Sequence, residues 1–159
     1  MSVDGRLQIV SLREEHVLSC ARLMASSEPW TRYDLHADAA ASLWRRALRD
    51  GAGVSIACLE ARVVGFAWYV AAGAFGLSGY LKQFGVDVGA RGRGVGTALL
   101  DHIERRTVED SQHDLFLLVS DFNLAAQRFY QGRGYEQVGA LQDYVMPGIA
   151  ELIYRKRLE

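Results

Sequence analysis

The chain has 159 residues, half of them hydrophobic and 23% charged, and a formal net charge of -1. These values are typical of a soluble protein built around one core, and we expect residues 1–159 to form a single domain. There is no basic tail, run of like charges, or apolar stretch near the roughly 18 residues of a spanning helix, which argues against nucleic-acid and membrane partners. The N-terminal residues carry no targeting pattern, so we expect a cytoplasmic protein.

The cysteine and histidine positions predict no metal site. Cys20 and Cys58 have neither metal-ligand spacing nor partners for a disulfide framework, and we expect both to be small core side chains. The four histidines lack the i, i+4 spacing of a helical metal pair.

Hydrophobic periodicity predicts strands over residues 7–12, 54–59, 63–72, 80–88, 115–119, 135–141 and 152–158. It predicts helices over residues 13–26, 35–49, 95–110 and 123–131, with Asp34 and Asn123 as N-caps of the second and fourth. The buried stripes of the first two helices are expected to be Val17, Leu18, Ala21 and Met24, then Ala39, Leu43, Ala47 and Leu48. The order β-α-α-β-β-β-α-β-α-β-β predicts one α/β domain with a mixed, mainly antiparallel sheet and helices on both faces.

A glycine-rich loop joins the strand ending near Val88 to the helix beginning near Val95. Glycines occupy positions 85, 89, 92, 94 and 96, with Arg91 and Arg93 among them. Backbone N–H groups at a helix N-terminus bind anions, and glycine lets the main chain approach a phosphate closely. The loop therefore predicts a site for a phosphate-bearing ligand, although a tight turn without a ligand is an alternative.

Two common phosphate motifs fit this loop poorly. A P-loop needs a lysine before the Ser/Thr that follows its last glycine, and here Thr97 is preceded by Gly96. A dinucleotide fingerprint needs a third glycine where Thr97 stands, and its strand would open a βαβ unit instead of following a hairpin.

A third pattern matches over two separate motifs. The segment 91–96, RGRGVG, resembles the Q/R-x-x-G-x-G/A signature of the GCN5-related N-acetyltransferase (GNAT) family. The segment 123–135 resembles that family's second motif, N-x-x-A-x-x-x-Y-x-x-x-G-F/Y, with Asn123, Tyr130 and Tyr135 at its ends and centre. The predicted element order is also the family's order, so the resemblance covers nearly the whole chain.

The resemblance implies that the loop binds acetyl-CoA as the acetyl donor. Its pyrophosphate would lie over the backbone amides of residues 93–97, that is Arg93, Gly94, Val95, Gly96 and Thr97, at the positive end of the helix dipole, with Arg91 and Gly92 beside it. The main chain of Val86 and Val88 would pair with the pantetheine arm, near a bulge at Gly85. The N–H of Val86 would polarise the thioester carbonyl.

The second motif supplies two further residues. The resemblance places Asn123 at the cofactor, in addition to its role as a helix N-cap, and Tyr130 near the thioester sulfur as the proton donor to the departing thiolate. A core aromatic beside Phe129 is the plain structural alternative for Tyr130.

The acceptor side is less well defined by the sequence. Trp30 and Tyr33 lie where family members shape the acceptor pocket, and the segment 143–148 resembles the last hairpin of members that acetylate protein N-termini, including ribosomal ones, so that Tyr144 would contact a peptide. Lys82 and Gln83 occupy the strand positions where many members carry a catalytic glutamate. The other candidates for a base, Glu28, His36, Asp143 and Glu151, are each expected to be solvated. Deprotonation of the amine through water is an equal alternative, so no base is assigned.

The resemblance therefore implies acetyl transfer from acetyl-CoA to a primary amine, either a small molecule or a peptide N-terminus, by direct attack in a ternary complex. No cysteine lies in the motifs, which disfavours a covalent acetyl-enzyme. A non-catalytic acyl-CoA-binding domain with the same fold is the alternative. A monomer and a homodimer are both compatible with the sequence.

Overall fold

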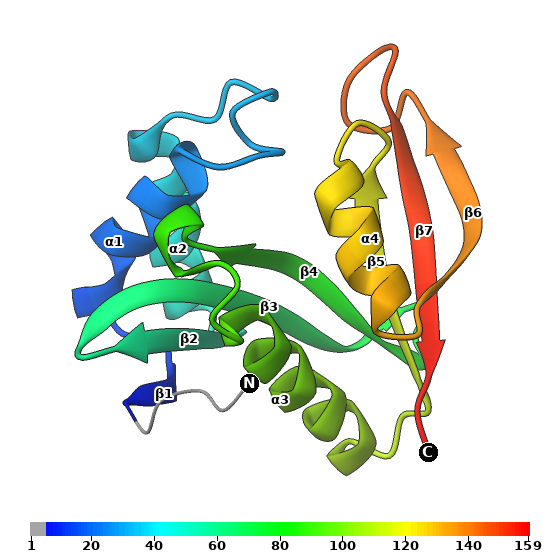
Figure 1. Ribbon diagram of the computed structural model, residues 1–159, viewed down its shortest axis with the longest axis horizontal. Helices are drawn as coiled ribbons and strands as arrows, with labels where there is room; N and C mark the ends of the chain where they lie inside the picture. Colours follow the sequence, from blue (N-terminus) through cyan, green and yellow to red (C-terminus); the bar gives the residue numbers. More distant parts are fainter. Residues whose placement is uncertain (1–5) are drawn as a thin grey trace. The chain divides into compact units, whose positions relative to one another are not determined.

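The computed structural model describes residues 6–159 and contains seven strands and four α-helices (Figure 1). The strands are β1 (Leu7–Ser11), β2 (Gly53–Leu59), β3 (Arg62–Ala74), β4 (Ser78–Val86), β5 (Asp114–Ser120), β6 (Glu136–Gln142) and β7 (Ala150–Arg157). The helices are α1 (Glu14–Ala25), α2 (Ala37–Arg49), α3 (Val95–Glu109) and α4 (Leu124–Gly132), with a 3-10 turn, η1, at Val88–Ala90. The predicted element order and the α/β fold class are confirmed.

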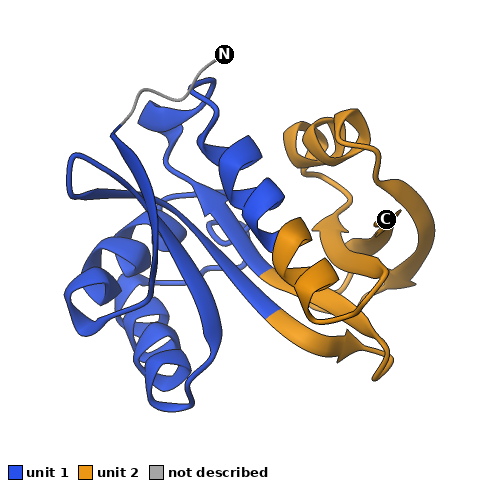
Figure 2. Cartoon of the chain, turned by 90° about the horizontal axis from the view of Figure 1, so that it is seen from below, with its two compact units in different colours: residues 1–69, 83–103 blue, residues 70–82, 104–159 orange. Residues whose placement is uncertain are grey.

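The strands form one hydrogen-bonded series in the order β1-β2-β3-β4-β5-β7-β6. The pairing of β4 with β5 is parallel and joins Gly79–Leu81 to Leu115–Leu117. The pairings of β1 with β2, β2 with β3, β5 with β7 and β6 with β7 are antiparallel, which makes the sheet mixed. The chain divides into two compact units, and β3 and β4 each contribute residues to both (Figure 2).

Unit 1 contains the described residues up to Tyr69 together with Gln83–Ile103. Its core lies where α1 and α2 cover β2 and β3, and the fully buried rings of Trp44 and Phe66 meet edge to face at 4.8 Å. On the other face of β3, Gly65 leaves room for α3, since a Cβ there would lie 2.9 Å from Leu99 Cδ1. Unit 1 therefore has helices on both faces of its strands.

Unit 2 contains Val70–Lys82 and Glu104–Glu159. Its central strand is β5, where Leu115, Leu117 and Val119 are buried and alternate with the partly exposed Phe116 and Leu118. The antiparallel pairing with β7 runs the full length of β5, from Asp114 opposite Arg157 to Ser120 opposite Glu151. This alternation gives β5 two distinct faces, a buried one and a more open one.

The local predictions failed at a few positions. Asp34 is not an N-cap, because it has a φ of 57° in the preceding turn and α2 begins at Ala37 with His36 as its cap. Ala39 is exposed, and the stripe that α2 buries is centred on Trp44. Leu18 of α1 is 52% exposed. The hydrophobic periodicity located both helices correctly, but it placed part of the buried face of each helix one residue position away from where it lies.

None of the helices within residues 6–159 is long and apolar enough to cross a membrane.

Candidate functional site

The predicted anion-binding loop lies in unit 1 between β4 and α3. The strand ends at Val86, two residues earlier than predicted, so Val88 is not a strand residue but the first residue of η1. Gly92 and Gly94 then take φ values of 74° and 81°, in the left-handed region that favours glycine. Two positive-φ residues so close together turn the main chain sharply into the first turn of α3, which begins at Val95.

The start of α3 leaves backbone donors available, because the first N–H groups of an α-helix have no partner within it. The first turn of α3 carries no acidic residue, so nothing on the helix itself opposes an anion there. A Cβ built at Gly92 would meet no atom within 4 Å, so the space in front of this residue is open. The loop therefore offers open, electropositive main chain.

The charged side chains around the loop are mostly basic. Arg91 and Arg93 are exposed. The nearest acid along the chain, Asp87, accepts a hydrogen bond from Arg62 at 2.8 Å, and its backbone N–H donates to Val64 O. Because Arg62 neutralises Asp87, the loop keeps its positive character. This pairing of β3 with the loop entrance was not anticipated from the sequence, since 25 residues separate the two side chains.

Asn123 and Tyr130 lie in unit 2, at the start and near the end of α4. The Asn123 side chain accepts a hydrogen bond from the Ala126 N–H at 3.3 Å, which confirms its predicted role as the helix N-cap. Tyr130 is 6% exposed, and its ring meets those of Phe129 and Tyr135 edge to face at 5.3 and 5.5 Å. Burial raises the pKa of the Tyr130 hydroxyl well above its ordinary value, so this group stays protonated.

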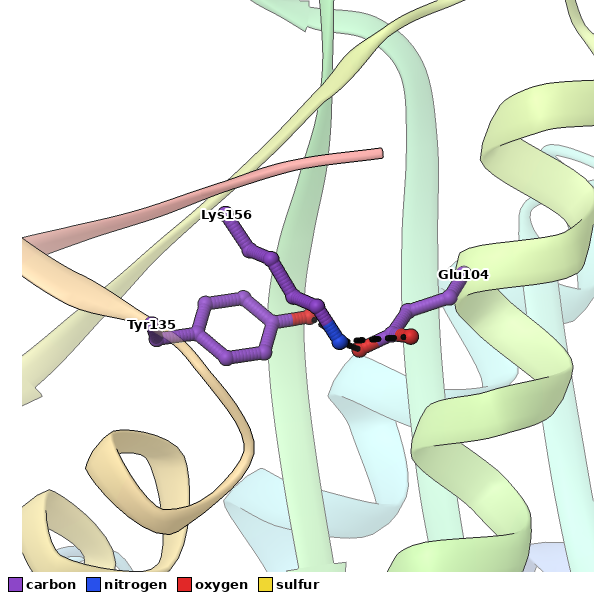
Figure 3. Close-up of polar contacts among 3 residues, drawn as sticks. All are labelled: Glu104, Tyr135 and Lys156. Carbon is purple, nitrogen blue, oxygen red and sulfur yellow. Dashed lines mark hydrogen bonds and ion pairs between the residues drawn. The ribbon is translucent and has the colours of Figure 1, made fainter. Parts of the chain in front are cut away.

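Tyr135, which packs against Tyr130, is held by a polar cluster (Figure 3). Its hydroxyl donates to Glu104 Oε1 of α3 at 3.0 Å, and Lys156 of β7 donates to both Glu104 oxygens at 3.0 Å. Burial, and then the Glu104 carboxylate, raise the pKa of Tyr135, so its hydroxyl remains a donor. The cluster fixes the ring that borders Tyr130.

The residues predicted to bind the acceptor fall into different surroundings. Trp30 is 8% exposed in the core of unit 1, where it packs against Phe66 and donates from Nε1 to Gln83 Oε1 at 3.2 Å. Tyr33 is half-buried in the turn between α1 and α2. Tyr144 is 64% exposed and lines an apolar hollow of unit 2.

The candidate bases also differ from one another. Glu28, His36 and Asp143 are exposed, as expected. Glu151 is not solvated as expected, because it is only 5% exposed and accepts a hydrogen bond from Ser120 Oγ at 2.9 Å. The sequence could not show this burial, which arises from the pairing of β7 between β5 and β6.

The sequence model of the acetyltransferase (GNAT) family matches residues 14–135, about three quarters of the chain. The chain belongs to the GNAT family. The matched region includes the loop of unit 1, Asn123 and Tyr130. No curated protein sequence matches the chain.

Solved structures share the GNAT fold along almost the whole length of the chain. A GNAT-family protein from Desulfovibrio desulfuricans has a TM-score of 0.81 at 21% identity, covering 96% of this chain and 99% of that one. The ribosomal-protein-alanine N-acetyltransferase of Brucella melitensis has a TM-score of 0.75 at 23% identity, covering 95% and 99%. An aminoglycoside 6'-N-acetyltransferase solved with coenzyme A has a TM-score of 0.77 at 15% identity, covering 94% and 96%.

This GNAT protein is thus an acetyltransferase by family, with the fold that the two motifs implied. Among the described residues, no group of three or more histidine, cysteine or acidic side chains is arranged to hold a metal ion. The predicted donor residues from Val86 to Thr97 belong to unit 1, and Asn123 and Tyr130 belong to unit 2. Of the predicted acceptor-side residues, Trp30 and Tyr33 belong to unit 1 and Tyr144 belongs to unit 2.

Proposed function

We propose that the protein transfers the acetyl group of acetyl-CoA to a primary amine by direct attack in a ternary complex. The observation that carries this proposal is the loop before α3, where two glycines with positive φ lead into a helix whose first turn has no acidic side chain. Main-chain amides in such a loop suit the pyrophosphate of coenzyme A. Arg93, Gly94, Val95, Gly96 and Thr97 would supply the amides.

The neighbouring residues extend this donor site. Arg91 and Arg93 would add charge-assisted hydrogen bonds to the phosphates, and Gly92 would leave the space that the pyrophosphate needs. The backbone of Val86, the last residue of β4, would pair with the pantetheine arm, and the Val86 N–H would donate to the thioester oxygen as negative charge develops there.

The chemistry needs a neutral amine and a stabilised leaving group. The amine lone pair attacks the thioester carbonyl, a C–N bond forms, and the C–S bond breaks with its electrons on sulfur. A phenol with a pKa near 10 protonates a thiolate whose conjugate acid has a pKa near 8.5 only at a cost of about 2 kcal/mol. Because burial raises the pKa of Tyr130 further, we propose that its hydroxyl stabilises the developing thiolate by a hydrogen bond. Asn123 would serve the cofactor in addition to capping α4.

The acceptor is proposed to be a small-molecule amine or the α-amine of a peptide. Of the similar structures, the aminoglycoside 6'-N-acetyltransferase is named for a small-molecule acceptor. The Brucella melitensis protein is named for a ribosomal-protein acceptor. Trp30, Tyr33 and Tyr144 remain the proposed acceptor residues. Of the three, Tyr144 is the most exposed and has the strongest structural support, since it lines an open hollow.

The proposal is tested by measuring acetyl-CoA binding and the release of free CoA thiol with a panel of amines. We expect Gly94→Glu to abolish binding, because it places bulk and negative charge where the pyrophosphate would lie. Gly51→Glu is the matched control, since Gly51 also has a positive φ, 65°, with no atom near a built Cβ, and lies outside the loop.

Unchanged affinity in Gly94→Glu would refute the pyrophosphate site. Binding of acetyl-CoA without turnover above hydrolysis on any amine would favour the second candidate, a non-catalytic acyl-CoA-binding domain. The specific observation behind that candidate is that Gln83, at the strand position of the usual carboxylate, is instead engaged by Trp30.

A further inference from the structure

Unit 2 contains an apolar hollow of about 380 Å³. This volume lies within the roughly 300–1,000 Å³ range of small-molecule sites. The side chains that shape it are Phe75 in the turn after β3, Tyr80 of β4, Phe116 and Leu118 of β5, Tyr144 after β6, and Ile153 of β7. The hollow therefore lies over the more open face of β5.

Four of these side chains are aromatic. Phe75 is 80% exposed, and its ring meets that of Phe116 edge to face at 5.4 Å. Tyr80 and Tyr144 line the same hollow with hydroxyl-bearing rings. Aromatic faces carry negative charge density and attract cations as well as apolar groups.

A buried carboxylate lies on the same face. Glu151 of β7 pairs with Ser120 of β5 and with Leu141 of β6, and Leu141 lines the hollow. Because side chains alternate along a strand, Glu151 points to the same side of β7 as Ile153, which also lines the hollow. The hydrogen bond from Ser120 Oγ fixes one oxygen of this carboxylate.

Electrostatics independently connect Glu151 with the wall of the hollow. Burial raises the pKa of Tyr80, and Tyr144 and then Glu151 raise it further. The carboxylate therefore acts on the Tyr80 hydroxyl, and a cation in the hollow would be within reach of the same field.

We propose that this hollow binds the acceptor of the acetyl transfer proposed above, and that the acceptor is a primary amine attached to an apolar or aromatic group. The ammonium would donate to the Glu151 carboxylate while the apolar group packs among Phe75, Phe116 and Tyr144. The amine then loses one proton to water before its nitrogen attacks the thioester. Glu151 is on this account the residue that selects and holds the acceptor.

The composition of the hollow also excludes acceptors. An aminoglycoside carries several ammonium and hydroxyl groups, whereas none of the residues that line the hollow is charged and Glu151 is the one carboxylate that the proposal assigns to it. Most of those polar groups would lose water without gaining a partner, which costs free energy for each group. The hollow thus favours a monoamine over a polycation.

The first test uses the unaltered protein with phenethylamine, its neutral analogue phenethyl alcohol, and kanamycin as the polycationic amine. Phenethylamine should be acetylated, and the alcohol should inhibit competitively but bind roughly 10- to 100-fold more weakly, the range expected for losing one charge-assisted hydrogen bond. Equal affinity for the amine and the alcohol, or a preference for kanamycin, would overturn the proposal.

The second test compares variants by one ratio, the dissociation constant of phenethyl alcohol divided by that of phenethylamine. Glu151→Gln keeps an oxygen to accept from Ser120 but removes the charge, so the ratio should fall to about 1 while the affinity for acetyl-CoA is unchanged. Glu136→Gln neutralises an exposed acid on β6 and should leave the ratio unchanged. A ratio that stays high in Glu151→Gln would show that Glu151 does not hold the ammonium. Partial unfolding of the variant would weaken the apparent binding of both ligands by the same factor, so it would not change the ratio.

If Glu151→Gln fails to fold, Phe75→Ala provides a second variant, since this exposed side chain can be truncated with little effect on the core. It should raise the KM for phenethylamine more than that for ethylamine, and equal effects would overturn the proposal. A peptide beginning with phenylalanine, run beside phenethylamine, shows whether the amine comes from a peptide or a small molecule. If other amines are acetylated but neither phenethylamine nor this peptide is, the hollow is not the acceptor site, while the acetyltransferase proposal still stands.

Discussion

Tyr130 combines burial with a hydroxyl that stays protonated, because burial raises its pKa. If this hydroxyl stabilises the thiolate, Tyr130→Phe should lower kcat by roughly 10- to 100-fold, the effect expected for losing one hydrogen bond to a charged group. The KM for acetyl-CoA should change little, because the ring and its packing remain. Steady-state kinetics with both substrates measure this separation.

A second buried tyrosine provides the control for that experiment. Tyr154 of β7 is fully buried, and its hydroxyl accepts a hydrogen bond from Gln131 at 3.0 Å. Tyr154→Phe also removes one buried hydroxyl from unit 2. Equal losses of kcat in the two variants would show that the Tyr130 effect is structural.

The two cysteines are both buried, which agrees with their prediction as core residues. Burial, and then the neighbouring Cys58, raise the pKa of Cys20 to about 12, so almost none of the Cys20 side chain is a thiolate at pH 8 in the folded protein. We expect Cys20 to react with Ellman's reagent only after unfolding. Rapid labelling of the native protein at both cysteines would contradict this expectation. If the cysteines do not react, the protein adds no thiol signal to the assay for free CoA.

The same shift predicts a direction for stability at alkaline pH. The folded state holds the Cys20 proton more tightly than the unfolded chain, whose thiol has a pKa near 8.5. The contribution of this group is therefore constant below that pH, and the free energy of unfolding falls as the pH rises from about 9 toward 12.

At the scale of elements, β4 is shaped by packing on its unit 1 side. Gly85 is buried, and a Cβ there would lie 2.7 Å from Phe66 Cζ and 3.2 Å from the Trp30 ring. We expect Gly85→Ala to lower the free energy of unfolding by about 1–3 kcal/mol, the usual cost of overpacking a core. Urea denaturation measures the loss.

Gly132 at the end of α4 provides the comparison, because no atom lies within 4 Å of a built Cβ. Gly132→Ala should be neutral or slightly stabilising, since alanine has the higher helix propensity. If Gly85→Ala were equally neutral, the close approach of the two rings would not be what requires glycine at this position.

The elements themselves were predictable because their signals are local. The glycines before Val95, the cap at Asn123 and the apolar run of β5 each lie within a few residues of the structure that they specify. The burial of Glu151 and the pairing of Arg62 with Asp87 depend on which strands lie together, and a charged residue gives no local sign of that. The donor loop was therefore readable from the sequence, while the hollow and its carboxylate required the structure.

At the scale of the molecule, the two units divide the proposed tasks. Unit 1 holds the loop with Gly92 and Gly94, and unit 2 holds Tyr130, the cluster that fixes Tyr135, and the hollow with Glu151. The proposals for the pyrophosphate and for the hollow can therefore fail separately, because the loop belongs to unit 1 and the hollow belongs to unit 2. Gly94→Glu tests the first, and Glu151→Gln tests the second.

A ligand that binds only the folded state raises its stability, so acetyl-CoA should shift thermal unfolding of the whole chain. At 100 times its dissociation constant the gain is about 2.7 kcal/mol, or roughly 5–10 °C for a chain of this size. Gly51→Glu should retain the shift and Gly94→Glu should lose it. Acetyl-pantetheine carries the thioester but no pyrophosphate, so at equal concentration it should give a much smaller shift. An equal shift would mean that the pantetheine arm, not the loop before α3, anchors the donor.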